Sequence, residues 1–121
     1  MKKSEIGKLG EMAAADFLRK KGYTIQCANF RTRFGEVDII CTNTSFIVFV
    51  EVKTRAKDSM ILPREAVDFF KQNKIIKATQ QYLMQNPIDL QPRFDVIEIT
   101  TQKSSEFKIL SINLIENAFT L

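Results

Sequence analysis

Mostly small and apolar residues spaced three or four apart form two rows over residues 4–21, the spacing that keeps side chains on one face of a helix. The rows are Leu9, Ala13 and Phe17, and Gly7, Glu11, Ala14 and Leu18. Ser4 is a candidate N-cap, and Gly22 follows the expected last turn. We therefore predict a helix over 4–21, with Glu11 standing among small and apolar residues, either as an edge charge or as a ligand.

After this helix the hydrophobic period shortens to that of strands. Residues 23–33 alternate, residues 35–40 form a second short run, and residues 46–54 are apolar on both faces as far as Val50, which is typical of a central strand. Asn43-Thr44 lies between the second and third runs, so we expect those strands to form a hairpin.

The remaining pattern predicts a long helix over 63–85 and strands over 93–100 and 106–114, with a turn at Ser104-Ser105. Pro63 suits the first turn of the helix. Phe69, Ile76 and Leu83 repeat every seven residues, with Phe70 beside them, and predict its buried face. The other face carries Lys71, Lys74 and Lys77, which is more often a solvated surface than a binding surface.

The predicted order of helix, three strands, helix and two strands indicates a single α/β domain, residues 1–121, with a mixed central sheet flanked by helices. The helix over 63–85 can connect strands 46–54 and 93–100 in parallel. The chain is 121 residues long and 45% hydrophobic, enough for one core.

Four charged residues occupy positions of the predicted hairpin where a sheet normally has apolar core residues. Glu36 and Asp38 share one face of the second strand, and Glu51 and Lys53 share one face of the third. Two carboxylates about 5 Å apart at an effective dielectric of about 20 repel by roughly 3 kcal/mol. Such a cluster calls for a cation.

Composition narrows the chemistry. The chain contains no histidine, which excludes histidine-based acid–base catalysis, histidine-paired nucleophiles and histidine-ligated zinc. Cys27 and Cys41 lack the spacing of a zinc or redox site, so we expect reduced thiols. The net charge is +4 and the isoelectric point is near 9.2, a mild excess compatible with a polyanionic partner.

An acidic residue on one strand and Glu-x-Lys on its neighbour is the pattern of metal-dependent phosphodiester cleavage. Asp38, Glu51 and the carbonyl of Val52 offer oxygen ligands suited to Mg²⁺ or Mn²⁺, and Glu36 and Glu11 could add outer ligands or hold a second metal. Lys53 could orient or deprotonate the attacking water. The basic residues expected to contact nucleic acid are Arg31, Arg33, Arg55, Lys57 and Lys71.

Simpler interpretations stay open. The strand charges could form exposed salt bridges, although these contribute only about 0 to 1 kcal/mol each. The loop Arg31-Thr32-Arg33-Phe34-Gly35 could equally be a solvated turn or a phosphate-facing loop. The whole scaffold could be a non-catalytic nucleic-acid-binding module, or an adaptor for another DNA-processing protein.

Several motifs together resemble the YraN family of small bacterial proteins. They are Gly7-x-x-Gly10-Glu11-x-x-Ala14, Gly35-Glu36-Val37-Asp38-Ile39-Ile40, Phe49-Val50-Glu51-Val52-Lys53-Thr54-Arg55 and Arg93-Phe94-Asp95-Val96. The resemblance implies a restriction-endonuclease-like PD-(D/E)xK fold with an αβββαβ core, similar to archaeal Holliday junction resolvases. It also implies Asp38, Glu51 and Lys53 as the core site, with Glu11 as a helix-borne acid.

The sequence thus leads us to expect a metal-dependent nuclease acting on DNA rather than RNA, on branched or single-stranded substrates. The N-terminus lacks the apolar run of a signal peptide, and no stretch is long enough to span a membrane. We therefore expect a cytoplasmic protein without membrane contact. A homodimer is compatible with the resemblance, but no self-complementary surface can be identified.

Overall fold

The computed structural model describes residues 1–58, 68–103 and 106–120. Within these ranges, two helices and five strands follow one another in the predicted order. The elements are α1 (Lys3–Lys20), β1 (Thr24–Arg31), β2 (Glu36–Thr42), β3 (Phe46–Ala56), α2 (Phe69–Gln85), β4 (Gln91–Thr101) and β5 (Ile109–Phe119). The mixed α/β prediction is confirmed.

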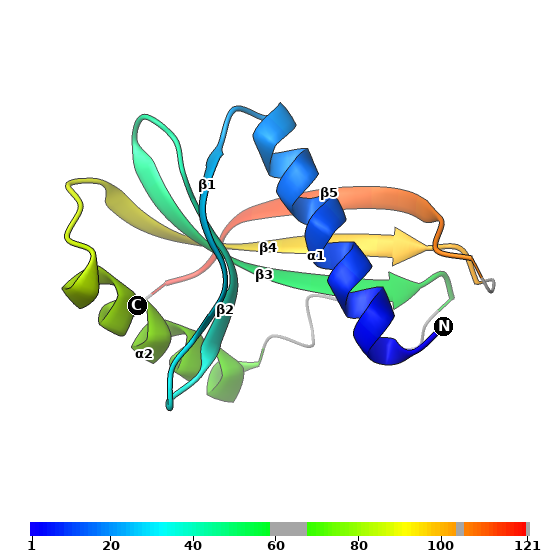
Figure 1. The fold of residues 1–121 in the computed structure, drawn as a ribbon, viewed down its shortest axis with the longest axis horizontal. Coiled ribbons are helices and arrows are strands. Elements are labelled where there is room, and N and C mark those ends of the chain that lie inside the picture. The colour runs from blue at the N-terminus through cyan, green and yellow to red at the C-terminus, as the bar shows by residue number, and fades with distance from the viewer. Residues whose placement is uncertain (59–67, 104–105, 121) are drawn as a thin grey trace.

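The strands form one sheet in the order β1-β2-β3-β4-β5 (Figure 1). All neighbours are antiparallel except β3 and β4, which pair in parallel along their whole length, from Phe46 with Gln91 to Ala56 with Thr101. The crossover through α2 makes this parallel pairing possible, as expected. β3 is the central strand, and its residues 47–51 are buried.

Each face of the sheet is covered by one helix. On one face, Ala14 and Leu18 of α1 pack with Ile39, Val50 and Ile97. Close packing is possible there because position 10 is glycine: a Cβ at Gly10 would collide with the Thr54 hydroxyl on β3. On the other face, Ile75 and Ala78 of α2 pack with Ile40, Phe49 and Phe94. The sheet therefore separates two hydrophobic clusters.

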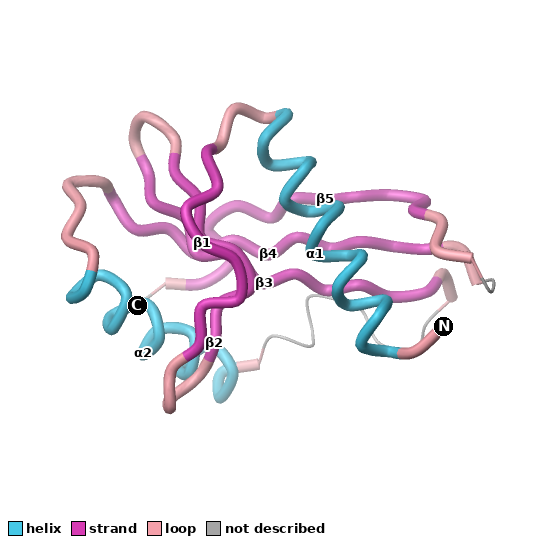
Figure 2. Tube along the Cα trace, viewed as in Figure 1, coloured by secondary structure: helices cyan, strands magenta, loops and turns pink. Residues whose placement is uncertain are grey.

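The β1–β2 hairpin curls away from the rest of the sheet toward α2 (Figure 2). β2 pairs with β3 from Ile39 with Val50 to Thr42 with Ile47, so β2 leaves β3 where the acidic residues begin. The Thr32 hydroxyl accepts hydrogen bonds from the backbone N–H groups of Phe34 and Gly35, at 3.0 and 3.2 Å, and closes the hairpin loop. Gly35 lies against α2, where a Cβ would come within 2.7 Å of the Lys74 carbonyl oxygen. The loop is thus seated on the helix.

Some predicted boundaries were wrong. α1 begins at Lys3 with Lys2 as its N-cap, and Ser4 lies inside the helix. α2 begins at Phe69, because the Asp68 carboxylate caps it by accepting a hydrogen bond of 2.9 Å from the Lys71 N–H. The predicted start at Pro63 and the turn at Ser104-Ser105 lie outside the described residues. β5 begins later than expected and extends to Phe119, which packs on Phe94.

The predicted buried face of α2 was wrong at its N-terminal end. Phe69 is 77% exposed and Phe70 is 70% exposed, whereas Ile75, Ala78 and Thr79 are buried. The seven-residue repeat placed Phe69 in register with Ile76 and Leu83, which are only partly buried. Two adjacent phenylalanine rings therefore lie at the surface, at the start of a helix. Within the described residues, neither helix is long and apolar enough to cross a membrane.

Candidate active site beside a basic groove

Asp38 and Glu51 lie just beyond the last residues that β2 and β3 pair. Beyond the last backbone pair, Ile39 with Val50, the Asp38 side chain connects the two strands: its Oδ2 accepts a hydrogen bond of 2.8 Å from the Val52 N–H. Asp38 is 8% exposed and Glu51 is 4% exposed. Two acidic side chains are thus buried side by side at the point where the strands separate.

Two lysines approach the same oxygen of Glu51. Lys53 Nζ lies 3.2 Å from Glu51 Oε1, and Lys71 Nζ from α2 lies 2.6 Å from it. Alternation along β3 puts Lys53 on the face of Glu51, and the first turn of α2 brings Lys71 over that face. Asp38, Glu51, Lys53 and Lys71 together are called the carboxylate site below.

The electrostatics of Asp38 reflect crowding. Burial and the charge of Glu51 raise the pKa of Asp38 to about 7, against an ordinary value of 3.8, and the Val52 hydrogen bond only partly opposes this. Burial lowers the pKa of Lys53, and so does its neighbour Lys71, while Glu51 opposes this change. For Lys71, burial lowers the pKa but hydrogen bonds to Glu51 and Lys53 outweigh it and raise it overall.

Glu11 and Glu36 lie at the edge of this site. Burial raises the pKa of Glu11, a hydrogen bond with the Asn29 side chain lowers it, and the charges of Glu36 and Glu51 raise it further. Glu36 is bound instead by Arg31, whose Nε lies 3.2 Å from Glu36 Oε2 in an exposed ion pair. Glu11 therefore acts on the site through space, and Glu36 belongs to its outer rim.

The donor set fits a hard divalent cation. Among the described residues, no group of three or more Asp, Glu or Cys side chains is arranged to hold a metal ion. Mg²⁺ and Mn²⁺, however, commonly take one or two carboxylates and complete their coordination with water and substrate phosphate. Asp38 and Glu51 supply two carboxylates, and their mutual repulsion is the kind that a cation removes.

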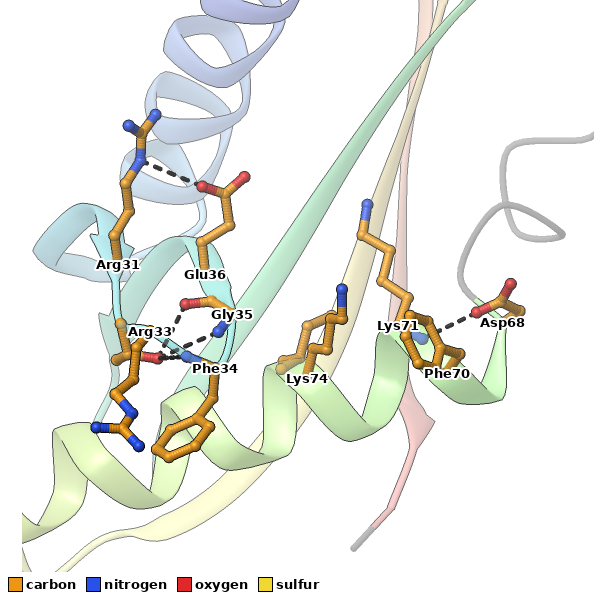
Figure 3. Close-up of a pocket in the computed structure, with 11 residues that line it drawn as sticks. Arg31, Arg33, Phe34, Gly35, Glu36, Asp68, Phe70, Lys71 and Lys74 are labelled. Atoms are coloured by element: carbon orange, nitrogen blue, oxygen red, sulfur yellow. Dashed lines mark hydrogen bonds and ion pairs between the residues drawn. The ribbon is translucent and has the colours of Figure 1, made fainter.

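A groove of about 580 Å³ opens next to the carboxylate site, between the β1–β2 loop and the start of α2 (Figure 3). Its walls are residues 31–36 on one side and Asp68, Phe70, Lys71, Lys74 and Ile75 on the other. The Lys71 and Lys74 side chains project from α2 in the same direction, with Arg31 and Glu36 across the opening. Lys71 lines this basic groove and also contacts Glu51, so the groove and the carboxylate site share this lysine.

The other predicted nucleic-acid contacts lie elsewhere. Arg55 and Lys57 stand at the far end of β3, four and six residues beyond Glu51, which places Arg55 about 13 Å along the strand. Lys57 is exposed, and its N–H donates to the Thr101 carbonyl. The site thus has basic residues on two sides, with the groove on only one of them.

Comparison with known proteins shows the family of this chain. The model of a family described as "Uncharacterised protein family UPF0102" matches residues 10–99. The chain belongs to the UPF0102 family. This is the family identified above as YraN from the strand motifs.

Relatives in this family match this chain over nearly its whole length. A UPF0102 protein of Caldanaerobacter subterraneus subsp. tengcongensis is 45% identical over 118 residues, covering 97% of this chain and 96% of the relative. One from Alkaliphilus oremlandii is 47% identical over 118 residues, covering 95% and 97%. One from Clostridium botulinum strain Loch Maree is 45% identical over 120 residues, covering 97% and 95%.

Sequence reasoning missed two features of this UPF0102 protein. It treated Lys71 as a nucleic-acid contact on a solvated face, whereas Lys71 reaches Glu51 from a different element. It also gave no role to Asn29. This residue of β1 has a positive φ of 54°, and its side chain forms a hydrogen bond with Glu11. An asparagine in a strand pattern signals a left-handed position, but its partner could be found only from the fold.

Proposed function

We propose that this UPF0102 protein is a divalent-metal-dependent nuclease that hydrolyses phosphodiester bonds in DNA, on a restriction-endonuclease-like scaffold. The observation that carries the proposal is the carboxylate site itself, in which Asp38, Glu51 and Lys53 converge where two strands separate. The adjacent basic groove supports an anionic polymer as the substrate. The location we propose for this activity is the cytoplasm.

Asp38 and Glu51 would hold Mg²⁺ or Mn²⁺, with the Val52 carbonyl as a further ligand. When bound, such an ion supplies an activated water and offsets the charge that develops on the phosphate. Lys53 lies beside Glu51, where it would orient the attacking water, and its neutral form, which burial favours by lowering its pKa, would accept the proton of that water. The water oxygen bonds to phosphorus, the bond to the leaving oxygen breaks, and that oxygen takes a proton from solvent. Lys71, which stays protonated, is placed to contact the phosphate.

The test is a cleavage assay on single-stranded, flapped, branched and duplex DNA, with an RNA strand for comparison. We expect cleavage with Mg²⁺ or Mn²⁺, none in excess chelator, and a loss of about 10²- to 10⁴-fold in Asp38→Asn, Glu51→Gln and Lys53→Met. Asp16→Asn is the matched control, because Asp16 lies in an exposed helical ion pair with Lys20. Cleavage that persists in Glu51→Gln or in chelator would show that another site or a contaminant is responsible.

One observation favours a second candidate, a nucleic-acid-binding module without catalysis. Lys53 and Lys71 both contact Glu51 Oε1, so the chain itself offsets the charge of that carboxylate. In such a module the acidic side chains would oppose binding, and Asp38→Asn with Glu51→Gln should tighten DNA binding. Calorimetry distinguishes the two: the nuclease binds Mn²⁺ through Asp38 and Glu51, and the module does not.

A further inference from the structure

The basic groove carries exposed aromatic rings among its cations. Phe34, 45% exposed, comes from the β1–β2 loop, and Phe70, 70% exposed, comes from the first turn of α2. They therefore enter the groove from opposite walls. Large exposed apolar rings contribute little to folding, and aromatic rings beside cations are typical of surfaces that bind single-stranded nucleic acid.

A cation lies against each ring. Lys74 Nζ is 4.5 Å from the centre of the Phe70 ring, and the Arg33 guanidinium is 5.1 Å from the centre of the Phe34 ring. Lys77 Nζ lies 5.9 Å from the Phe34 ring on its helix side. These charges can pair with phosphates on either side of a stacked base, because a base and its phosphate need a flat surface and a cation at neighbouring positions.

The groove lies where a strand bound in it would come close to the carboxylate site. Lys71 lines the groove next to Phe70 and contacts Glu51 at 2.6 Å. A strand whose base rests in the groove would therefore run its backbone along Lys71 toward the carboxylate site. The groove volume of about 580 Å³ falls within the range of about 300 to 1,000 Å³ typical of small-ligand pockets, enough for about one nucleotide.

We infer that the basic groove is a binding site for an unpaired nucleotide, whose base stacks against Phe34 and Phe70 while Arg33 and Lys74 hold the flanking phosphates. This inference rests on the proposed function and names its substrate class: DNA with unpaired bases next to the bond that is cut, as in single strands, flaps and branch points. A fully paired duplex buries its bases and cannot offer them to the rings.

The test separates base stacking from charge. Binding of a labelled thymidine strand of about 12 nucleotides is measured by anisotropy in chelator, beside an abasic strand of the same length with the same phosphates. We expect wild type to bind the normal strand more tightly than the abasic one. Phe34→Ala and Phe70→Ala should each weaken binding of the normal strand by about 5- to 150-fold and leave the abasic strand unchanged. Phe70→Tyr keeps the ring and should retain wild-type binding.

Two controls make the result specific. Phe69→Ala removes a neighbouring ring that is 77% exposed but does not line the groove, and should bind as wild type does. Lys74→Met should weaken binding of both strands alike and reduce the log-log salt slope by about 0.7, since it removes one phosphate contact. Equal binding of normal and abasic strands by wild type, or unchanged binding of the normal strand by both alanine variants, would overturn the inference.

The assay also separates this inference from the nuclease proposal. It contains no metal and measures no cleavage, so stacking on Phe34 and Phe70 can be demonstrated even if the protein cuts nothing. Conversely, metal-dependent cleavage by wild type combined with unchanged single-strand binding in Phe34→Ala and Phe70→Ala would leave the nuclease proposal intact and refute the groove. A uridine strand in parallel tells whether the site distinguishes DNA from RNA.

Discussion

The sheet holds two buried charge clusters, and they are built on opposite principles. The first is the arginine cluster of Arg93, Asp95 and Tyr23, and the second is the carboxylate site. In the arginine cluster, Arg93 donates from Nε and Nη2 to the two oxygens of Asp95 at 2.9 and 2.8 Å, and from Nη2 to the Tyr23 hydroxyl at 2.6 Å. The Asn117 N–H adds a third hydrogen bond to Asp95 at 3.0 Å.

Charges in the arginine cluster are balanced and enclosed. The hydrogen bonds to Asp95 raise the pKa of Arg93 far above its already high value, and the Phe46 ring lies 4.7 Å from the guanidinium. In the carboxylate site two acidic groups face each other instead, and the pKa of Asp38 rises to about 7. In the arginine cluster the carboxylate meets a guanidinium, whereas in the carboxylate site both lysines contact Glu51 and Asp38 is crowded by a second carboxylate. Crowding of this kind is common at functional sites, which is why we propose the carboxylate site as the functional one.

The largest expected effect is on stability, at the arginine cluster. Asp95→Ala should lower the free energy of unfolding by about 3 to 5 kcal/mol, because it leaves the buried Arg93 with only the exposed Glu116 carboxylate, at 3.9 Å. Urea denaturation measures the change. Metal binding per folded molecule should stay at the wild-type level, since Asp95 bonds Arg93 on the α1 face of the sheet, whereas Glu51 meets Lys71 of α2 on the other face.

The double variant Arg93→Met with Asp95→Leu is the control for this result. It removes both charges and should be less destabilised than Asp95→Ala alone, as expected where an unpaired charge causes the loss. A single variant that unfolds as wild type does would mean that the cluster is not structural.

A smaller effect is expected when a cation is added to the carboxylate site. Mn²⁺ at about 100 times its dissociation constant should stabilise wild type by about 2.7 kcal/mol, because only the folded chain brings Asp38 and Glu51 together. Thermal unfolding with and without Mn²⁺ measures this. Glu51→Gln should lose the increment, while the arginine-cluster variants should keep it. An undiminished increment in Glu51→Gln would place the metal elsewhere.

The sequence predicted those features of the fold and the site that depend on residues close together in the chain. The strand alternation correctly placed Glu51 and Lys53 on one face, because both lie on one strand. The order of elements and the parallel pairing of β3 and β4 also followed from local pattern and connection length. The nuclease assignment of the site stays a prediction.

Features that depend on contacts between distant elements were not predicted. The seven-residue repeat could not tell that α2 begins at Phe69, so its first ring was assigned to the core rather than the surface. The Lys71 contact with Glu51 and the bonds of Arg93 to Tyr23 join residues far apart in the chain. Periodicity reports which face a residue occupies, not which side chain meets it across the fold.

The raised pKa of Asp38 predicts that stability depends on pH. Its pKa is higher in the folded chain than its ordinary 3.8, so between about pH 4 and 7 the folded chain binds a proton that the unfolded chain does not. Stability in chelator should therefore fall as pH rises through this window. Asp38→Asn, which keeps an acceptor for the Val52 N–H, should stabilise the protein by about 1 to 3 kcal/mol at pH 8.

The stabilisation of Asp38→Asn relative to wild type should shrink by at least half at about pH 5, where Asp38 of wild type is protonated in the folded chain. Denaturation of the two proteins over this pH range in chelator checks it, with Asp16→Asn as the exposed control. A destabilised Asp38→Asn at pH 8 would show that the Asp38 charge is already compensated, as in the arginine cluster.

The smallest effect should come from the exposed pair at the rim of the groove, Arg31 with Glu36. Glu36→Gln should change the free energy of unfolding by no more than about 0.5 kcal/mol, because solvent screens a pair in which both side chains are more than half exposed. Since Glu36 is bound by Arg31 rather than by the carboxylate site, the substitution should also leave Mn²⁺ affinity within about 2-fold of wild type, a difference of roughly 0.4 kcal/mol. Calorimetric titration beside Glu51→Gln measures both variants. A tenfold loss of Mn²⁺ affinity in Glu36→Gln would make Glu36 a metal ligand, as the strand pattern first indicated, and would extend the carboxylate site to the mouth of the groove.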